Sequence, residues 1–134
     1  MDKSNRDRPI FILGNPRSGT SLLRLMLHSH SQICIPPESH FFLWLEVKYG
    51  IWSLEMLEDF IQDLFNATKF ETWNINREEL SDFIINAAPK TYSFLISLIY
   101  QFYAEKHRGE SKYWGDKNSL WTDKLERIRF YYPN

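Results

Sequence analysis

The sequence predicts an α/β fold in which a parallel sheet is flanked by helices and carries a helical insertion. Residues 9–13 form a continuous apolar run, which is typical of a strand covered on both faces. A turn-rich loop at 14–19 leads into residues 20–28, whose side chains are apolar around most of a helical circumference. We therefore expect helix 20–28 to be largely buried. A short second strand at 32–35 ends at two prolines, because proline cannot donate to a sheet ladder.

The helical insertion is predicted over residues 39–107. Asn76 and Glu79 have the spacing of a helix N-cap with a capping box. Beyond the insertion, the pattern predicts a third strand at 112–117 and the start of another helix at 123–130. Two apolar stripes at helical spacing indicate core-facing sides, with a substrate-facing wall as the alternative, and they consist of Leu80, Phe83, Ile84 and Ala87, then Leu95, Leu98, Ile99 and Phe102.

Composition narrows the class of protein. A chain of 134 residues can bury one core, so we expect a single domain over residues 1–134 with a polar arm at 1–8. A formal charge of −1 disfavours nucleic acid as a partner and is compatible with one small anionic ligand. The most apolar stretch, 92–104, is shorter than the roughly 20 residues of a membrane span. The single cysteine, Cys34, and the lack of an export signal indicate a cytoplasmic protein.

Residues 14–21 are the strongest candidate for a ligand site. Two glycines stand five positions apart between a strand and a helix, which is the spacing of a phosphate-binding loop, but Thr20 replaces its usual lysine and the cation is Arg17. The loop N–H groups and the positive end of the next helix favour a tetrahedral anion, and the Arg17 guanidinium can hold two of its oxygens. The hydroxyls of Ser18, Thr20 and Ser21 complete the predicted site. The alternative is a plain strand-to-helix turn.

Parallel strands would bring distant residues to this loop. Their carboxyl ends meet at the edge of the sheet where open α/β folds bind ligands. If the third strand is parallel to the first two, the loop, the turn at 37–40 and Lys117 face one crevice. We therefore expect three separate segments to converge on one anion.

Residues 9–20, read P-I-F-I-L-G-N-P-R-S-G-T, strongly resemble the 5′-phosphosulfate loop of the sulfotransferase family. Residues 114–118 (W-G-D-K-N) look like the second short signature of that family. Residues 35–39 (I-P-P-E-S) resemble the acidic turn of its tyrosylprotein-sulfotransferase-like and related bacterial branches. The resemblance implies a P-loop-like fold and transfer of a sulfonate group from 3′-phosphoadenosine 5′-phosphosulfate (PAPS) to a hydroxyl or amine acceptor. It also implies that no metal is needed.

The resemblance assigns roles residue by residue. It implies that Glu38 accepts the proton of the acceptor, and that Lys117 stabilises the bridging oxygen as its bond to sulfur breaks. Arg17 is implied in both catalysis and donor binding. The residues implied in binding the 5′-phosphosulfate are Arg17, Ser18, Gly19, Thr20 and Ser21.

Other interpretations of these residues stay open. Glu38 could be a solvated loop carboxylate, and Lys117 could be a surface lysine. His40 competes with Glu38 for the role of base, because the pKa of imidazole is nearer neutrality. A phosphate-loop kinase or nucleotidase is the alternative enzyme, and a non-catalytic remnant that binds an anion is the third possibility.

Members of the family are usually much longer than this chain. The resemblance therefore implies that residues 1–134 are the N-terminal portion of a single sulfotransferase-like domain, or a truncated product, with only part of the full fold present. The residues that bind the 3′-phosphate of the donor would then lie beyond Asn134. The aromatic helices suit a small-molecule, carbohydrate, lipid or peptide acceptor equally well. We also expect an exposed apolar patch and a tendency to self-associate.

Overall fold

The protein contains a three-stranded parallel sheet. The computed structural model describes residues 8–14, 19–109 and 111–133. The strands are β1 (Ile10–Ile12), β2 (Ile33–Cys34) and β3 (Tyr113–Lys117), and β3 lies between the other two in the order β1-β3-β2. The predicted α/β class with a parallel sheet is confirmed, although each strand is one to two residues shorter than the sequence pattern suggested.

The register fixes where the strands end relative to one another. Ile12 lies opposite Lys117 on the neighbouring strand, and Cys34 lies opposite Trp114. Gly115 lies opposite Ile10, and a Cβ added to this glycine would lie 2.5 Å from the carbonyl oxygen of Ile10. The strand pair therefore requires glycine at this position. Both β1 and β3 end at the same edge of the sheet, as the sequence predicts.

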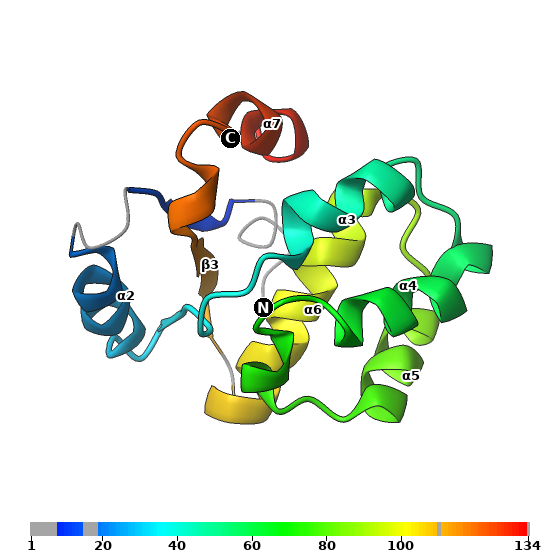
Figure 1. Ribbon diagram of the computed structural model, residues 1–134. Coiled ribbons are helices and arrows are strands. Elements are labelled where there is room, and N and C mark those ends of the chain that lie inside the picture. Colours follow the sequence, from blue (N-terminus) through cyan, green and yellow to red (C-terminus); the bar gives the residue numbers. More distant parts are fainter. Residues whose placement is uncertain (1–7, 15–18, 110, 134) are drawn as a thin grey trace.

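Helices cover the sheet from two sides. Helix α2 (Thr20–His28) and helix α6 (Tyr92–Arg108) both contact β3. Figure 1 shows α2 on one side of the strands and α6, with the rest of the helical insertion, on the other. Helix α7 (Leu125–Tyr131) follows the short 3₁₀ turn η3 (Ser119–Trp121) and lies above the carboxyl end of β3 in this view.

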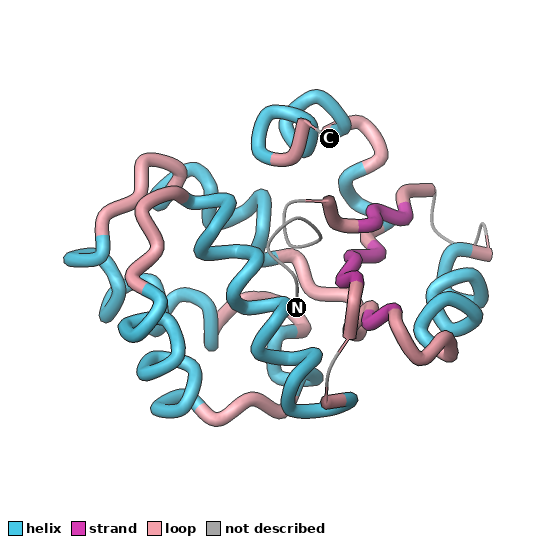
Figure 2. Tube along the Cα trace, turned by 180° about the vertical axis from the view of Figure 1, so that it is seen from behind, coloured by secondary structure: helices cyan, strands magenta, loops and turns pink. Residues whose placement is uncertain are grey.

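The helical insertion forms the larger part of the molecule, and Figure 2 shows it as one body of helices beside the strands. Asn76 caps α5 by accepting a hydrogen bond from the Glu79 N–H at 3.0 Å, as predicted, and Thr91 caps α6 in the same way. Besides α6, its elements are α3 (Phe41–Tyr49), η1 (Leu54–Met56), α4 (Leu57–Phe65), η2 (Phe70–Trp73) and α5 (Arg77–Ala87).

Aromatic rings join the insertion to the sheet. Tyr100 of α6 stacks on Trp114 of β3 with ring centroids 4.3 Å apart, and Phe41 packs against Tyr100 at 5.7 Å. The predicted stripe of α6 is buried throughout, and in α5 the stripe is buried at Leu80 and Ile84, half-buried at Phe83 and exposed only at Ala87. The burial of both stripes shows that they face the core, as expected. Removal of such large apolar side chains from water stabilises the fold.

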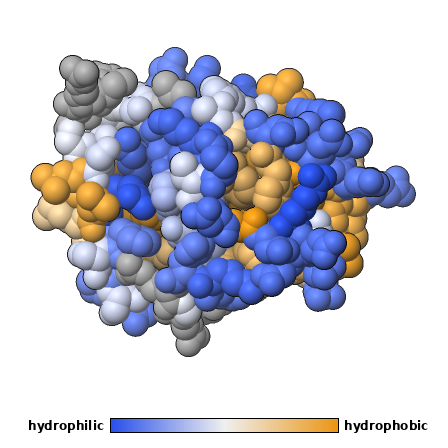
Figure 3. Space-filling view, turned by 60° about the horizontal axis from the view of Figure 1, so that its bottom comes forward, coloured by the Kyte–Doolittle hydropathy of each residue, from blue (hydrophilic) through white to orange (hydrophobic). Residues whose placement is uncertain are grey.

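Helix α2 is not buried, and the expectation from its composition was wrong. Thr20 is buried and Arg24 is half-buried, with its Nε donating to the carbonyl oxygens of Ile35 and Pro36 at 3.1 and 2.9 Å. The opposite side of the helix carries exposed apolar side chains, which form the orange area at the left of Figure 3. An apolar composition predicts burial only where another element covers the helix, and none of the described residues covers this side. The exposed residues are Leu22, Leu23, Leu25 and Met26.

No helix in the described ranges combines the length and the apolar character needed to cross a membrane.

Candidate functional site

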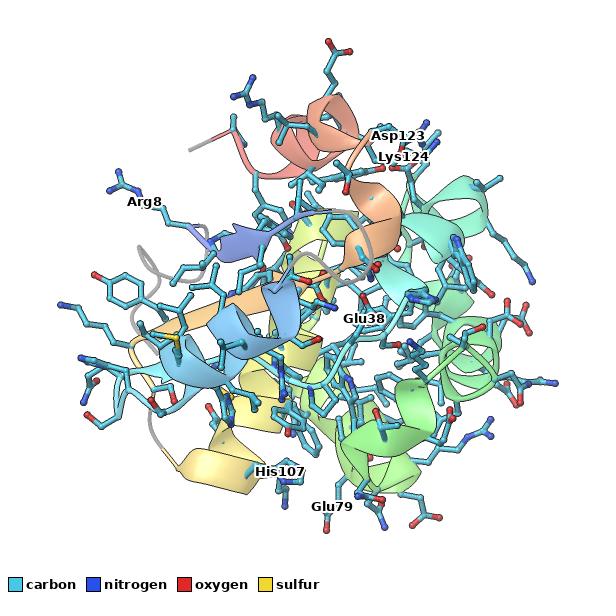
Figure 4. The ribbon with its side chains drawn as sticks, turned by 60° about the vertical axis from the view of Figure 1, so that its left-hand side comes forward. Arg8, Glu38, Glu79, His107, Asp123 and Lys124 are labelled. Atoms are coloured by element: carbon cyan, nitrogen blue, oxygen red, sulfur yellow. The ribbon has the colours of Figure 1, made fainter. Side chains whose placement is uncertain are left out.

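Glu38 and Lys117 form an ion pair at the carboxyl end of β3. Lys117 Nζ lies 3.4 Å from Glu38 Oε1. The side chain of Lys117 is only 9% exposed and that of Glu38 is 15% exposed, so neither is a solvated surface group. Figure 4 shows Glu38 in the centre of the molecule. The predicted convergence of the turn at 37–40 with the end of β3 is therefore present in the structure.

Two further donors hold the Glu38 carboxylate. The N–H of Ser119 donates to Oε1 at 2.9 Å, and Lys69 Nζ donates to Oε2 at 3.0 Å. Burial alone would raise the pKa of Glu38, but the hydrogen bonds from Ser119 and Lys69 and the charge of Lys117 outweigh it and lower that pKa to about 2. The carboxylate is therefore ionised at neutral pH.

Backbone hydrogen bonds explain why these segments meet. The Asn118 N–H donates to the carbonyl of Ile12 at 3.0 Å, and its side-chain amide donates to the carbonyl of Ser39 at 2.8 Å. Asn118 therefore ties the end of β1, the Glu38 turn and the end of β3 together. On the other side of the turn, the indole N–H of Trp73 donates to the carbonyl of Pro37 at 2.7 Å. The polar groups of this turn are satisfied by partners from three directions, which fixes its course.

Lys69 reaches the site from the helical insertion. Its backbone has a φ of 67°, which is the left-handed region that a side chain with a Cβ rarely adopts. The segment is anchored next to it, because the Thr68 carbonyl accepts hydrogen bonds from the Ser39 hydroxyl at 3.1 Å and from the His40 N–H at 3.4 Å. The insertion thus contributes a cation to the Glu38 carboxylate at a strained position, which is typical of functional sites.

The phosphate-binding loop lies partly inside the described residues. Gly19, with a φ of 87°, forms the N-cap of α2, and no side-chain hydrogen bond caps this end of the helix among the residues described. Thr20 is buried and Ser21 is exposed in the first turn. Arg17 and Ser18 lie outside the described residues. Because Ile12 is opposite Lys117, the loop leaves β1 next to the Lys117–Glu38 pair.

His40 lies beside Glu38 and Trp44. Its Nε2 is 3.9 Å from Glu38 Oε2, and its ring meets Trp44 edge-on with centroids 4.9 Å apart. Burial lowers the pKa of His40, although the charge of Glu38 opposes this effect. Neither ring nitrogen has a hydrogen-bond partner among the described residues. The lowered pKa favours the neutral form of His40. The two candidate bases, Glu38 and His40, therefore lie side by side.

A comparison with models of protein families matches residues 9–134 to the sulfotransferase family. The chain belongs to the sulfotransferase family. No curated protein and no solved structure matches it in two further comparisons. The matched range includes the loop after β1, the turn that carries Glu38 and the strand that ends at Lys117. Family membership supports sulfonate transfer as the general kind of reaction.

Asp116 is a buried acid next to Lys117 in the candidate site, and sequence reasoning assigned it no role. The Tyr100 hydroxyl donates to Asp116 Oδ1 at 2.5 Å, and the other carboxylate oxygen has no hydrogen-bond partner in the described part of the chain. Burial raises the pKa of Asp116 to about 7, although the hydrogen bond from Tyr100 opposes the shift and the charge of Glu38 adds to it. Asp116 therefore changes its protonation state near neutral pH.

Sequence reasoning also missed Lys69 and Ser119. No motif marks Lys69, which is 31 residues from its partner Glu38 and lies within the insertion. Ser119 directly follows the W-G-D-K-N segment, and its N–H is the donor to Glu38. Its position just past the end of β3 was the one feature of the sequence that could have indicated this role. Both residues donate hydrogen bonds to Glu38, and they make its negative charge the best supported feature of the candidate site.

Proposed function

We propose that this protein transfers a sulfonate group from PAPS to a hydroxyl or amine of an acceptor. The observation that carries the proposal is the ion pair of Lys117 and Glu38, which lies next to the point where the loop leaves β1. A cation for the departing phosphate and a carboxylate for the proton of the acceptor are the two charges that this reaction requires.

The residues around the loop suit the 5′-phosphosulfate of the donor. The N-terminus of α2, at Gly19, has no side-chain cap in the described part of the chain, and the first N–H groups of a helix are suited to bind an anion. Lys117 supplies a nearby ammonium group. Arg17, Ser18, Thr20 and Ser21 would add the guanidinium and hydroxyl donors that hold the remaining oxygens.

The proposed step is an in-line displacement at sulfur. The acceptor oxygen or nitrogen forms a bond to sulfur while the bond from sulfur to the bridging oxygen of the phosphate breaks. Adenosine 3′,5′-bisphosphate leaves with the electron pair of that bond. Lys117 and Arg17 stabilise the negative charge that gathers on the phosphate, and Glu38 takes the proton of the acceptor.

The surroundings of Glu38 affect how well it takes this proton. A carboxylate whose pKa is about 2 is a weak base while Ser119, Lys69 and Lys117 all donate to it. When Lys117 turns its charge toward the departing phosphate, Glu38 loses one of these partners and its pKa rises. Movement of Lys117 toward the departing phosphate therefore makes it easier for Glu38 to take the proton of the acceptor. In turn, a protonated Glu38 holds Lys117 less strongly.

Binding of adenosine 3′,5′-bisphosphate tests the donor assignment. Titration calorimetry without magnesium should detect binding to the wild-type chain, and Arg17→Ala should weaken it about 10- to 100-fold, the effect of losing charge-assisted hydrogen bonds. Arg129→Ala, at an exposed position of α7, is the control and should bind normally. Unaltered binding by Arg17→Ala, or tighter binding of magnesium–ATP than of the bisphosphate, would overturn the proposal in favour of a kinase-like site.

A further inference from the structure

A cavity of about 340 Å³ lies between α3 and the segment that continues from η3 into α7. Its floor is apolar and buried, whereas Trp44 and Val47 on α3 are exposed along its wall. This volume is at the small end of the range for small-molecule sites. The residues that line it are Leu43, Trp44, Val47, Trp121, Lys124 and Arg127.

Each wall of this cavity contains one residue that is linked to Glu38 through a neighbour. On one wall, His40 lies 3.9 Å from the Glu38 carboxylate and packs against Trp44, which lines the cavity. On the other wall, Ser119 donates its N–H to Glu38 at 2.9 Å, and the same 3₁₀ turn ends at Trp121, which also lines the cavity. The end of the cavity near Trp44 and Trp121 is therefore connected to Glu38 through His40 on one wall and through Ser119 on the other, and these three residues lie behind the cavity lining.

The lining of the cavity contains one cation, Lys124, that forms no ion pair within the described residues. Val47 lies seven residues beyond His40, which corresponds to about 10 Å along a helix. Across from α3, the second wall continues through Lys124 to Arg127. Arg127 is paired with Glu46, whereas Lys124 is exposed and forms no ion pair within the described residues. No carboxylate lines the cavity, and Figure 4 shows Lys124 at the surface, away from Glu38.

A buried polar group without a hydrogen-bond partner belongs to the lining of this cavity. The indole N–H of Trp121 has no hydrogen-bond acceptor in the described part of the chain, although this side chain is only 2% exposed. Behind the lining, Nδ1 of His40 also has no hydrogen-bond partner in the described part of the chain, at 5% exposure. Leaving a buried donor unpaired costs stability, so the unpaired N–H of Trp121, a residue of the cavity lining, points to a polar ligand group there.

We propose that this cavity binds the sulfonate acceptor, and that the acceptor is a small amphiphilic acid with a ring-shaped apolar body. Its hydroxyl lies toward Glu38 and His40, its ring packs against Trp44, and its anionic group lies toward Lys124. This inference rests on the proposed sulfonate transfer and adds the class of acceptor to it. Charge at the far end selects the acid over a neutral analogue of the same shape.

A matched pair of probes tests this selection. Para-hydroxyphenylpropionate and its amide differ only in charge at the end away from the hydroxyl. Quenching of tryptophan fluorescence measures their binding to the full chain without any donor, and the apparent KM for each measures their use as acceptors with PAPS. We expect the acid to bind about fivefold more tightly than the amide, which is the upper range for an exposed ion pair.

Variants assign that preference to the cavity. Lys124→Gln and Val47→Glu should each remove the preference for the acid, and both positions are exposed, so neither change should prevent folding. Lys106→Gln removes an exposed lysine of α6 that pairs with Glu79, far from the cavity lining, and should keep the preference.

Each outcome decides a separate question. Equal binding of acid and amide, or a preference that survives Lys124→Gln, overturns the acceptor inference while the calorimetric test of the donor stands. A preference that depends on Lys124 without any sulfonate transfer keeps the cavity as an acid-binding site and overturns the proposed function.

Discussion

Glu38 and Lys117 are 79 positions apart in the sequence, and their charged atoms lie 3.4 Å apart at the carboxyl end of the central strand. The contact exists because β1 and β3 are parallel and end together, and because Asn118 bonds to both the β1 end and the Glu38 turn. Both side chains lie in a position that is mostly removed from water. The proposed chemistry depends on this pair.

Replacement of the two candidate bases separates their roles. Glu38→Gln should lower sulfonate transfer about 10²- to 10⁴-fold, because the amide keeps the shape of the side chain but cannot take the proton. His40→Gln should have a smaller effect and act mainly on the KM of the acceptor. Steady-state kinetics on both variants, with circular dichroism to verify folding, is the measurement. A larger loss of kcat in His40→Gln than in Glu38→Gln would assign the base to His40.

The charge of Lys69 should set the acid limit of activity. Lys69→Gln removes a hydrogen bond and a positive charge that both lower the pKa of Glu38, so that pKa should rise. The acid limb of the kcat/KM profile should then move to higher pH. Lys48→Gln is the matched control, because Lys48 pairs with Asp63 on the exposed side of the insertion. If the two variants have the same pH profile as the wild type, Lys69 does not act on the base.

The Asp116–Tyr100 pair should make stability depend on pH. Asp116 has a pKa of about 7 in the folded protein and an ordinary value of 3.8, so the folded state binds the extra proton between these limits. Stability should therefore fall as pH rises from about 4 to about 7, by on the order of a few kcal/mol. Asp116→Asn should lack this fall in urea unfolding experiments.

Tyr100→Phe provides the second variant for this pair. The Tyr100 hydroxyl donates to Asp116 and lowers its pKa, so its removal should raise that pKa further and extend the fall in stability to higher pH. If the wild type and Asp116→Asn show parallel stability curves between pH 4 and pH 7, the buried carboxyl does not hold its proton as described.

The exposed side of α2 should cause self-association. Leu22 and Met26 are 64% and 62% exposed on neighbouring turns of the helix, and contiguous apolar surface promotes contacts between molecules. Light scattering should show mass increasing with concentration, and the double variant Leu22→Gln, Met26→Gln should reduce the increase. Leu125→Gln, at an exposed apolar position of α7, is the control. A wild-type chain that stays monomeric at every concentration argues against the role of this surface.

The sequence predicted most of the fold because local signals and the fold agreed. The apolar run at the first strand, the Asn76 cap and the α6 stripe all depend on neighbours along the chain, and all three were confirmed. The meeting of Glu38 with Lys117 could be predicted as well, since it follows from parallel strands that end at one edge. The roles of the predicted site residues remain predictions.

The missed features depend on packing between distant segments. Lys69 reaches Glu38 because Thr68 is anchored to the turn by two hydrogen bonds, and no periodicity encodes such a contact. The exposure of α2 was mispredicted because its leucines indicate an apolar helix without indicating what covers it. The Asp116–Tyr100 hydrogen bond joins β3 to α6 through their relative placement, which local pattern does not fix.

Transfer of labelled sulfonate from PAPS to a phenolic acceptor tests the central claim most directly. Lys117→Ala should lower the single-turnover rate about 10²- to 10³-fold, because the bridging oxygen loses the cation that stabilises it. Lys112→Ala removes an exposed lysine just before the same strand and should transfer at the wild-type rate. An undiminished rate in Lys117→Ala would contradict the account.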